Sequence, residues 1–229
     1  MRKALGILFA GLWLSCAACS GIPKDAKHVT VSLEKIDCAD CGDEIVSDLR
    51  SRPGVYDAQF DKKAAEIKVV ASPEFDVLGT VKQLAANEGF DAVLGEGKGQ
   101  YIPHAPFPPG SDAQTVVSDG RDVADLTALL VKGKTTVVDF SAIWCRPCRK
   151  IDEYMATALA TRKEIAYRRL DIDDWDSPLA RHHLKEIPQL PYVIVYGPSG
   201  EKIDAIVGVD LPRLQKAIEK AAPAAPPAP

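Results

Sequence analysis

Hydrophobic positions along the chain follow two different periods, which predict secondary structure in two stretches, about residues 27–94 and 112–220. Around Val29 every second residue is apolar, as is typical of a half-buried strand. Apolar residues three or four positions apart predict helices near 43–51 and 77–85. The remaining strands of the first stretch are expected at 55–60, around 67–69 and at 90–94. The resulting order is βαββαβ, an open sandwich of helices on one sheet.

The second stretch alternates strands and helices. Helices are predicted at about 123–130, where Gly133 follows, and at 145–162 and 211–221. Strands are predicted at 135–142, 165–172, 192–197 and 201–208. This alternation predicts an α/β unit in which helices cover a mixed sheet.

Proline- and glycine-rich segments mark the boundaries of these two units. Residues 95–111, GEGKGQYIPHAPFPPGS, have no apolar periodicity and are expected to form a linker. Residues 221–229, AAPAAPPAP, are expected to form a stiff, extended tail. The predicted organisation is therefore two small domains joined by a linker and followed by a low-complexity end.

The first twenty residues have the order of a secretory signal. Arg2 and Lys3 precede an apolar run at 4–14, which is too short to span a membrane, and small residues follow it. The end of this segment, SCAACS, resembles a bacterial lipoprotein signal, which is cut before a cysteine that becomes acylated. The resemblance implies a signal at 1–18 and a lipid anchor on Cys19. A plain secretory signal is the alternative, and both interpretations place the protein in the periplasm or cell envelope.

Composition narrows the function further. Lys and Arg total 28 against 32 Asp and Glu, so the formal charge is −4 and offers no basic face for nucleic acid. An apolar share of 46% excludes a disordered chain. The six cysteines form three pairs, each with two intervening residues, at Cys16 and Cys19, Cys38 and Cys41, and Cys145 and Cys148. An exported protein with such pairs is expected to carry disulfides or metal ions.

The third pair falls where a predicted strand runs directly into a predicted helix. The N–H groups and dipole of a helix N-terminus stabilise an anion, so the pKa of the Cys145 thiol is expected to be low. Arg146 adds positive charge, and Pro147 suits a first helical turn. We therefore expect Cys145 to attack a substrate disulfide and Cys148 to resolve the mixed disulfide.

With its WCRPC motif at 144–148, the stretch 112–220 resembles the thioredoxin superfamily. The resemblance implies a thioredoxin fold and a redox centre that needs no cofactor. It assigns proton transfer to the buried Asp139, with Arg169 as the closest match to the lysine that often accompanies it. It also makes Pro191 a cis-proline facing the dithiol, which shapes the substrate groove together with Trp144.

A structural disulfide and half of a zinc site are the alternatives for this pair. A disulfide that closes so small a loop stabilises a fold little. Zinc normally takes four ligands, and His182 with His183 is the only nearby histidine pair. These two histidines are more typical of a solvated helix end.

The second pair, Cys38 and Cys41, is predicted to lie in the loop between the first strand and the first helix. Two thiolates on a flexible loop suit Cu(I) or another soft ion, which accepts few sulfur ligands. Asp37 and Asp40 bring negative charge close to the sulfurs, which a bound cation would offset. No third ligand is evident.

Residues 27–94 resemble a heavy-metal-associated domain of the copper-chaperone type. The two cysteines, the turn at 53–55 and the ending GFDA at 89–92 carry the resemblance. It implies a ferredoxin-like fold and a metal site at Cys38 and Cys41. The competing interpretation is that this pair is oxidised, or is a substrate of the second unit.

Together these features predict an envelope thiol:disulfide oxidoreductase, most simply a reductase, joined to a soft-metal-binding unit. Its expected partners are a protein disulfide or a copper-protein client and a membrane protein that donates electrons. One alternative is a copper or mercury binding protein in which the thioredoxin-like unit is a docking module. Another is an oxidase, whose reduction potential would lie near about −120 mV rather than about −270 mV.

Overall fold

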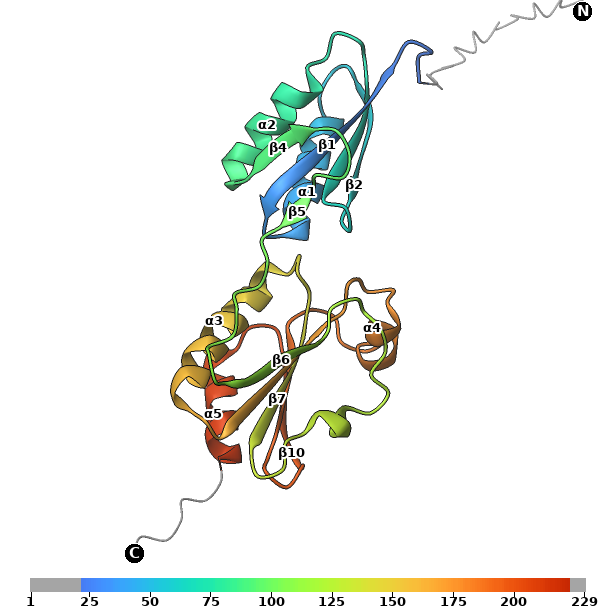
Figure 1. Cartoon of the computed structure of the whole chain (residues 1–229). Helices are drawn as coiled ribbons and strands as arrows, with labels where there is room; N and C mark the ends of the chain where they lie inside the picture. The colour runs from blue at the N-terminus through green and yellow to red at the C-terminus, as the bar shows by residue number, and fades with distance from the viewer. Residues whose placement is uncertain (1–21, 223–229) are drawn as a thin grey trace, which may run out of the picture.

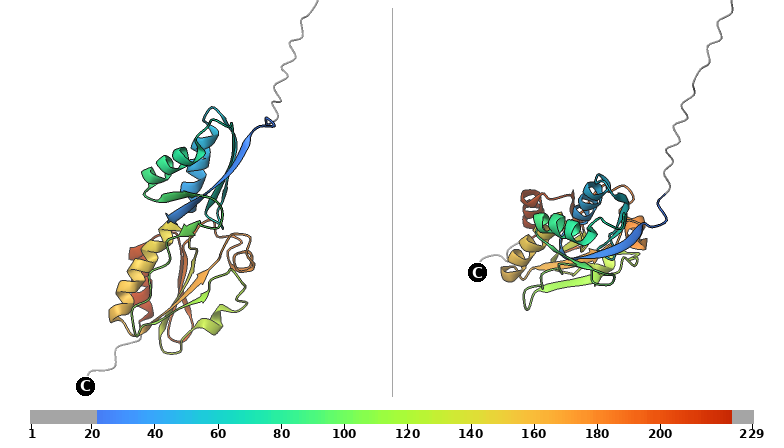
Figure 2. Two further views of the ribbon diagram at one scale, coloured as in Figure 1. Left: turned by 45° about the horizontal axis from the view of Figure 1, so that its top comes forward. Right: turned by 90° about the horizontal axis from the view of Figure 1, so that it is seen from above.

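The structure is a computed structural model that describes residues 22–222. Its two units follow one another along the chain, and Figure 1 shows the N-terminal unit at one end of the C-terminal unit. The left view of Figure 2 shows the same arrangement, and in the right view, seen from above, the two units overlap. The signal predicted at 1–18, the lipid anchor predicted at Cys19 and the tail from residue 223 lie outside the described residues.

The N-terminal unit has the predicted βαββαβ order. Its elements are β1 (Lys27–Ile36), α1 (Ala39–Arg50), β2 (Val55–Asp61), β3 (Glu66–Ala71), α2 (Val77–Glu88) and β4 (Asp91–Leu94). The sheet order is β2-β3-β1-β4, as the ferredoxin-like fold requires, and β1 pairs antiparallel with both β3 and β4. The two helices lie side by side against the sheet (Figure 1).

Apolar side chains at alternate positions of β1 point into the core of this unit. Val31 and Leu33 are fully buried, and they share one apolar cluster with Ile45 and Leu49 of α1. Helix α2 ends at Glu88, because the following residue, Gly89, adopts a left-handed φ of 87° that favours glycine. The hydrophobic pattern therefore predicted both the elements and the faces that they bury.

The C-terminal unit has a five-stranded sheet in the order β10-β9-β7-β8-β6. Its elements are β6 (Asp112–Val117), η1 (Leu126–Leu129), β7 (Thr135–Ser141), α3 (Arg146–Thr161), β8 (Ile165–Asp171), α4 (Pro178–His183), β9 (Tyr192–Tyr196), β10 (Lys202–Val207) and α5 (Leu211–Ala221). Strand β7 is parallel to β8 and antiparallel to β9. The mixed sheet and its covering helices match the predicted thioredoxin fold.

Successive side chains of the central strand β7 enter two different cores. Val137 packs with residues of α3 and α5, among them Ile151 and Leu214. Val138 and Phe140 belong to the other cluster, which also contains both cysteines at the start of α3. Because helices cover both faces, every residue of β7 is buried, as expected for a central strand.

Three features of this unit differ from the prediction. The expected helix at 123–130 is only the single 3₁₀ turn η1, in which the Asp125 carboxylate accepts from the N–H of Thr127 and Leu130 is already extended. Strand β6 was not predicted, because this edge strand mixes polar and apolar residues. Helix α4 was not predicted either, because its six residues are too few to show a helical period.

The predicted linker at 95–111 contains structure of its own. Strand β5 (Gln100–Tyr101) pairs in parallel with β1, and the N–H of Ile102 donates to the carbonyl of Ile36 at 2.9 Å. Farther along, the Phe107 ring packs edge-on against Tyr167, with 5.7 Å between the ring centroids. The connecting segment is therefore attached to both units. In the described part of the chain, no helix has the length and apolarity of a membrane span.

Candidate functional site: two facing cysteine pairs

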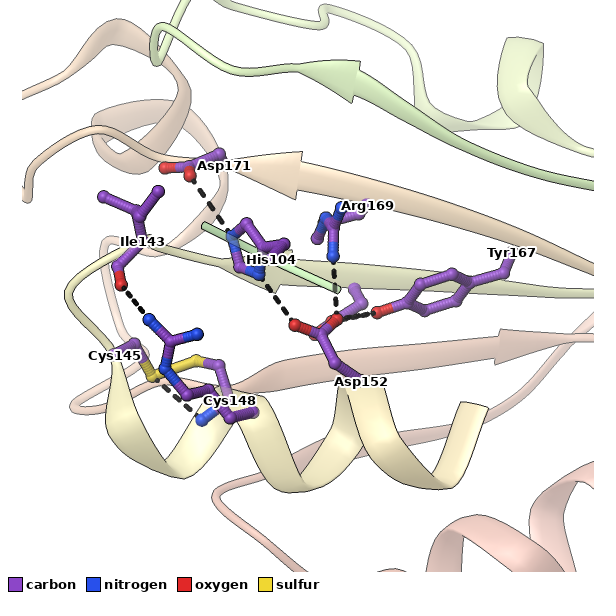
Figure 3. The surroundings of a disulfide bond; sticks show 10 residues. His104, Ile143, Cys145, Cys148, Asp152, Tyr167, Arg169 and Asp171 are labelled. Carbon is purple, nitrogen blue, oxygen red and sulfur yellow. Dashed lines mark hydrogen bonds and ion pairs between the residues drawn. A yellow bond between two sulfur atoms is a disulfide. The ribbon is translucent and has the colours of Figure 1, made fainter. Parts of the chain in front are cut away.

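Cys145 and Cys148 lie at the start of α3, where the sequence predicted them, and form a disulfide in this structure (Figure 3). Cys145 is the N-cap residue, and its sulfur accepts from the N–H of Cys148 at 3.2 Å. A tight turn after β7 sets this geometry, because the N–H of Cys145 donates to the carbonyl of Ala142 at 3.0 Å. Cys148 is fully buried and Cys145 is only 5% exposed.

Asp139 is fully buried on β7. The hydroxyl of Tyr167 donates to one carboxylate oxygen at 2.5 Å, and the other oxygen has no hydrogen-bond partner among the described residues. Burial raises the pKa of Asp139 to about 7, although the Tyr167 hydrogen bond opposes that rise. A carboxyl with this pKa can take up or release a proton near neutral pH.

A largely buried polar cluster around Asp152 adjoins Asp139 through Tyr167, and Figure 3 shows Tyr167, Asp152, Arg169 and His104 of this cluster. The Tyr167 hydroxyl also lies 3.2 Å from the carboxylate oxygen Oδ1 of Asp152, a residue of α3. Arg169 donates to the same oxygen at 3.0 Å. Burial alone would raise the pKa of Asp152, but the hydrogen bond with His104 and the charge of Arg169 lower it. Arg169 thus lies on the strand beside Asp139, as the resemblance implied, while its guanidinium binds Asp152.

His104 completes this cluster from the connecting segment. Its Nδ1 lies 2.7 Å from the Asp152 carboxylate, and its Nε2 lies 3.7 Å from Asp171. Burial lowers the pKa of His104, but the bonds to Asp152 and Asp171 outweigh burial and raise it. No local pattern in the sequence identifies His104, Tyr167 and Asp152, because their proximity depends on contacts between distant parts of the chain. A lone histidine among prolines was the only available signal.

The residues predicted to shape the substrate groove are Trp144 and Pro191. The peptide bond between Leu190 and Pro191 is cis, as the resemblance implied. Leu190 lines the cleft at the cysteines, while Pro191 is buried beside it. Trp144 also lines the cleft, and its indole N–H donates to the carbonyl of Asp173 at 2.6 Å.

The loop predicted for Cys38 and Cys41 holds only for the first of them: Cys38 lies in the connection between β1 and α1, whereas Cys41 lies inside α1. Cys38 is the N-cap residue of α1 and Cys41 is in its first turn, both are buried, and they form a disulfide. A contact with the other unit fixes this early helix start, because the N–H of Ala39 donates to the carbonyl of Trp144 at 3.0 Å. The two cysteine pairs therefore occupy equivalent positions at the starts of two helices.

Arg146 connects the two pairs. Its guanidinium donates to the Asp37 carboxylate at 2.7 Å and lies 3.3 Å from the sulfur of Cys41. The hydrogen bond with Asp37 raises the pKa of Arg146, which keeps the guanidinium charged. The sequence suggested Arg146 as a charge for its own dithiol, but its guanidinium contacts Asp37 and the sulfur of Cys41.

One cleft of about 490 Å³ contains residues of both pairs. Cys38, Cys41 and Cys145 all line it. Its charged lining residues are Asp40, Glu44, Glu88 and Arg146. The arrangement brings a redox dithiol, a second cysteine pair and a mainly acidic rim into one space.

A second group of possible ligands lies at the end of α4. Asp122, His182 and His183 place ligand atoms within 4.8 Å of one another. His182 is 47% exposed and binds the Asp122 carboxylate at 2.9 Å, while His183 contacts the carbonyl of Val123 at 2.7 Å. The two histidines thus lie at a helix end, as predicted, away from the cleft lining.

Comparison with known proteins assigns the C-terminal unit. The thioredoxin family model matches residues 122–220. Thioredoxin H-type 1 of Nicotiana tabacum is 32% identical over 92 residues, which cover 40% of this chain and 70% of that protein. The chain belongs to the thioredoxin family. We call residues 112–220 the thioredoxin domain and residues 27–94 the N-terminal domain.

Two further similarities complete the comparison. Thioredoxin-2 of Pyricularia oryzae is 29% identical over 106 residues, which are 46% of this chain, and the chain spans only 60% of its length. The solution structure of the yeast copper transporter domain CCC2A is 22% identical with a TM-score of 0.28, and the match covers 31% of this chain and 97% of that domain.

Replacing Asp139 by Asn is expected to stabilise the fold in a pH-dependent way. A buried carboxyl whose pKa rises from 3.8 to about 7 on folding destabilises the folded state increasingly between those pH values. The gain in the free energy of unfolding for Asp139→Asn should grow from pH 4 to pH 7, to on the order of a few kcal/mol. Urea unfolding of the oxidised protein at several pH values measures it.

Asp204→Asn is the matched control for this experiment. Arg213 lowers the pKa of Asp204, so that carboxylate stabilises the fold above its unfolded pKa. The substitution should therefore give no gain at high pH. A gain for Asp139→Asn that is the same at pH 4 and pH 8 would contradict the assigned pKa.

Replacing His104 by Ala is expected to destabilise the connecting segment. Loss of the Asp152 hydrogen bond should cost about 1–3 kcal/mol. Because the pKa of His104 is raised on folding, its contribution is fully present below its unfolded pKa of about 6.5 and is lost as the pH rises through the folded pKa. His104→Ala should thus cost more stability at pH 5.5 than at pH 9.

Limited proteolysis between residues 102 and 111 gives a second measurement for His104→Ala. Cleavage should become faster in the variant, whereas His182→Ala, which removes an exposed histidine, should leave it unchanged. Equal cleavage rates in the two variants would contradict the inference that His104 attaches the connecting segment to the thioredoxin domain.

Proposed function

We propose that this protein is an exported thiol:disulfide reductase with an attached soft-metal-binding domain. One observation carries the proposal: Cys145 caps the N-terminus of α3, where Cys148 donates an N–H to its sulfur, and the same domain buries the titratable Asp139. The first feature favours a thiolate at Cys145, and the second offers a proton acceptor near neutral pH. A merely structural disulfide needs neither feature.

The proposed reaction has two exchange steps. The Cys145 thiolate attacks one sulfur of a client disulfide and releases the other as a thiolate. Cys148 then loses its proton, for which Asp139 is the proposed acceptor, and attacks the Cys145 sulfur. The client leaves with two thiols, and Cys145 and Cys148 are left as a disulfide. An external dithiol, carried by a membrane protein in this proposal, returns the pair to the reduced state.

The N-terminal domain is proposed to carry Cu(I) or another soft ion as cargo on Cys38 and Cys41. The two sulfurs fit such an ion, because they lie side by side at the start of one helix and Asp37 is within ligand range. Two thiolates with Cu(I) leave one net negative charge, which the guanidinium of Arg146 is placed to balance. The ion binds only when this pair is reduced, which links the cargo to the reductase.

The acidic rim of the cleft supports a preference among clients. Asp40, Glu44 and Glu88 lie around the cysteines, so a basic segment of a client would be favoured over an acidic one. We propose copper-binding proteins as clients, because their ligand cysteines must be reduced before they can hold the metal.

Reduction of insulin disulfides with dithiothreitol as electron donor tests the reductase function. Cys145→Ser should abolish the catalysed rate, because the attacking sulfur is lost. Cys148→Ser should leave only a stoichiometric reaction, because mixed disulfides accumulate. The turbidity of precipitating insulin chains measures both effects.

Cys38→Ser is the matched control, since it removes a sulfur from the same cleft but leaves the thioredoxin dithiol intact. It should retain most of the insulin reductase activity. If Cys38→Ser abolishes activity and Cys145→Ser does not, the protein is instead a metal-binding protein whose thioredoxin domain only docks.

Mass spectrometry of the protein isolated from cell envelopes tests export, the lipid anchor and the metal site together. The expected mature chain begins at an acylated Cys19, and native spectra of reduced protein given Cu(I) should show one bound ion. Cys38→Ser should lose the ion, and Cys19→Ser should lose the lipid. An unacylated chain that retains residues 1–18 would contradict the proposed anchor.

A further inference from the structure

We infer that the disulfide between Cys38 and Cys41 is itself a substrate of Cys145, and that Arg146 makes Cys41 the sulfur that leaves. The inference rests on the proposed reductase function and names its internal client. The N-terminal domain then occupies the position of a bound client.

The contacts between the domains meet at the two cysteine pairs. The N–H of Ala39, directly after Cys38, donates to the carbonyl of Trp144, directly before Cys145. Trp144 and Ile143 also pack against the apolar core of the N-terminal domain. This backbone pairing aligns the start of α1 with the start of α3, so one pair faces the other across the cleft.

The connecting segment holds this arrangement from both sides. Strand β5 extends the N-terminal sheet, and His104, three residues later, binds Asp152 of the thioredoxin domain. Arg149 of α3 donates to the carbonyl of Ile102 at 2.7 Å. An exposed ion pair between Lys63 and Asp173, with 2.7 Å between the charged atoms, adds a further contact between the domains.

The position of Arg146 distinguishes the two sulfurs of the N-terminal pair. Its guanidinium lies 3.3 Å from the Cys41 sulfur, and no such donor contacts Cys38 within the described residues. Among the charged residues described in the cleft lining, Arg146 is the only cation. Negative charge that develops on Cys41 as the disulfide breaks is therefore stabilised by a guanidinium, whereas the Cys38 sulfur, at the N-terminus of α1, accepts no hydrogen bond from that helix.

The exchange balances without a further reagent once the thioredoxin dithiol is reduced. The Cys145 thiolate attacks the Cys38 sulfur, a bond between Cys38 and Cys145 forms, and Cys41 leaves as a thiolate beside Arg146. The Cys148 thiolate then attacks Cys145 and releases Cys38. Two electrons pass from the thioredoxin dithiol to the N-terminal pair. Cys145 and Cys148 each release one proton to water or a nearby base before they attack, and Cys38 and Cys41 each take up one proton afterwards. Glu88, 3.9 Å from the Cys41 sulfur, can accept a hydrogen bond from the new thiol.

The full-length Cys148→Ser variant traps the intermediate of this exchange. The purified protein is reduced with dithiothreitol, freed of it and oxidised with diamide, then quenched in acid. Free thiols are alkylated, and peptides are analysed by mass spectrometry without reduction. The expected species links Cys38 to Cys145 within one chain and carries the alkyl group on Cys41. Its yield should not depend on protein concentration, because the reaction is intramolecular.

A pair of charge variants tests the role of Arg146. Arg146→Gln in the Cys148→Ser background should slow formation of this link about tenfold, as expected for loss of a charge-assisted hydrogen bond. Lys150→Gln removes the same charge from an exposed position one turn farther along α3 and should leave the rate unchanged. For Arg146→Gln in the otherwise unchanged protein, insulin reduction should fall less than the internal exchange does.

Three outcomes would overturn the inference. They are a Cys38–Cys41 disulfide with Cys145 fully alkylated, a link that forms only between chains, and a link from Cys41 to Cys145 with Cys38 alkylated. If insulin reduction remains normal in the protein with Cys148 intact, each outcome removes only the internal exchange and leaves the proposed reductase. Loss of insulin reduction in that protein would instead remove the proposed function.

Discussion

The interaction on which the rest of the structure depends is that between the first turn of α3 and the sulfur of its N-cap residue, Cys145. An α-helix leaves its first N–H groups without partners, and a sulfur at the cap meets them. Strand β7 directs the chain into that turn from a fully buried position. Cys38 is likewise the N-cap residue of α1, although its sulfur accepts no hydrogen bond from that helix, and residues of both helix starts line one cleft.

Burial of the Asp139 and Asp152 carboxyl groups in the thioredoxin domain has an energetic cost that their hydrogen bonds and ion pairs only partly offset. Asp139 and Asp152 approach the same Tyr167 hydroxyl, which has one proton to donate. Arg169 and His104 offset the burial of Asp152 and lower its pKa, whereas the pKa of Asp139 stays raised. Stability is therefore lower than an uncharged residue at position 139 would allow. Such a cost is typical of a site that is built for proton transfer rather than for stability.

Local sequence was sufficient for much of the fold and for the thioredoxin dithiol. Periodicity predicted the elements of the N-terminal domain, and the placement of Cys145 and Cys148 follows from one strand, one turn and one helix, while Asp139 came from the resemblance to the thioredoxin superfamily. Local sequence did not predict features that depend on contacts between residues far apart in the chain. The predicted helix near 43–51 begins four residues earlier, at Ala39, and it includes Gly42, where a side chain would clash with the Phe60 ring. The positions of His104, β5 and Arg146 depend on packing between the domains, which no short pattern encodes.

The connecting segment has a kinetic consequence because both of its ends are attached. A tether that holds two partners together replaces their bulk concentrations by a local one, which reaches the millimolar range for short linkers. An external client at micromolar concentration would have to bind about a thousandfold more tightly than the N-terminal domain to occupy the cleft equally often. Release of His104 from Asp152 would lengthen the tether and shift that competition toward the client.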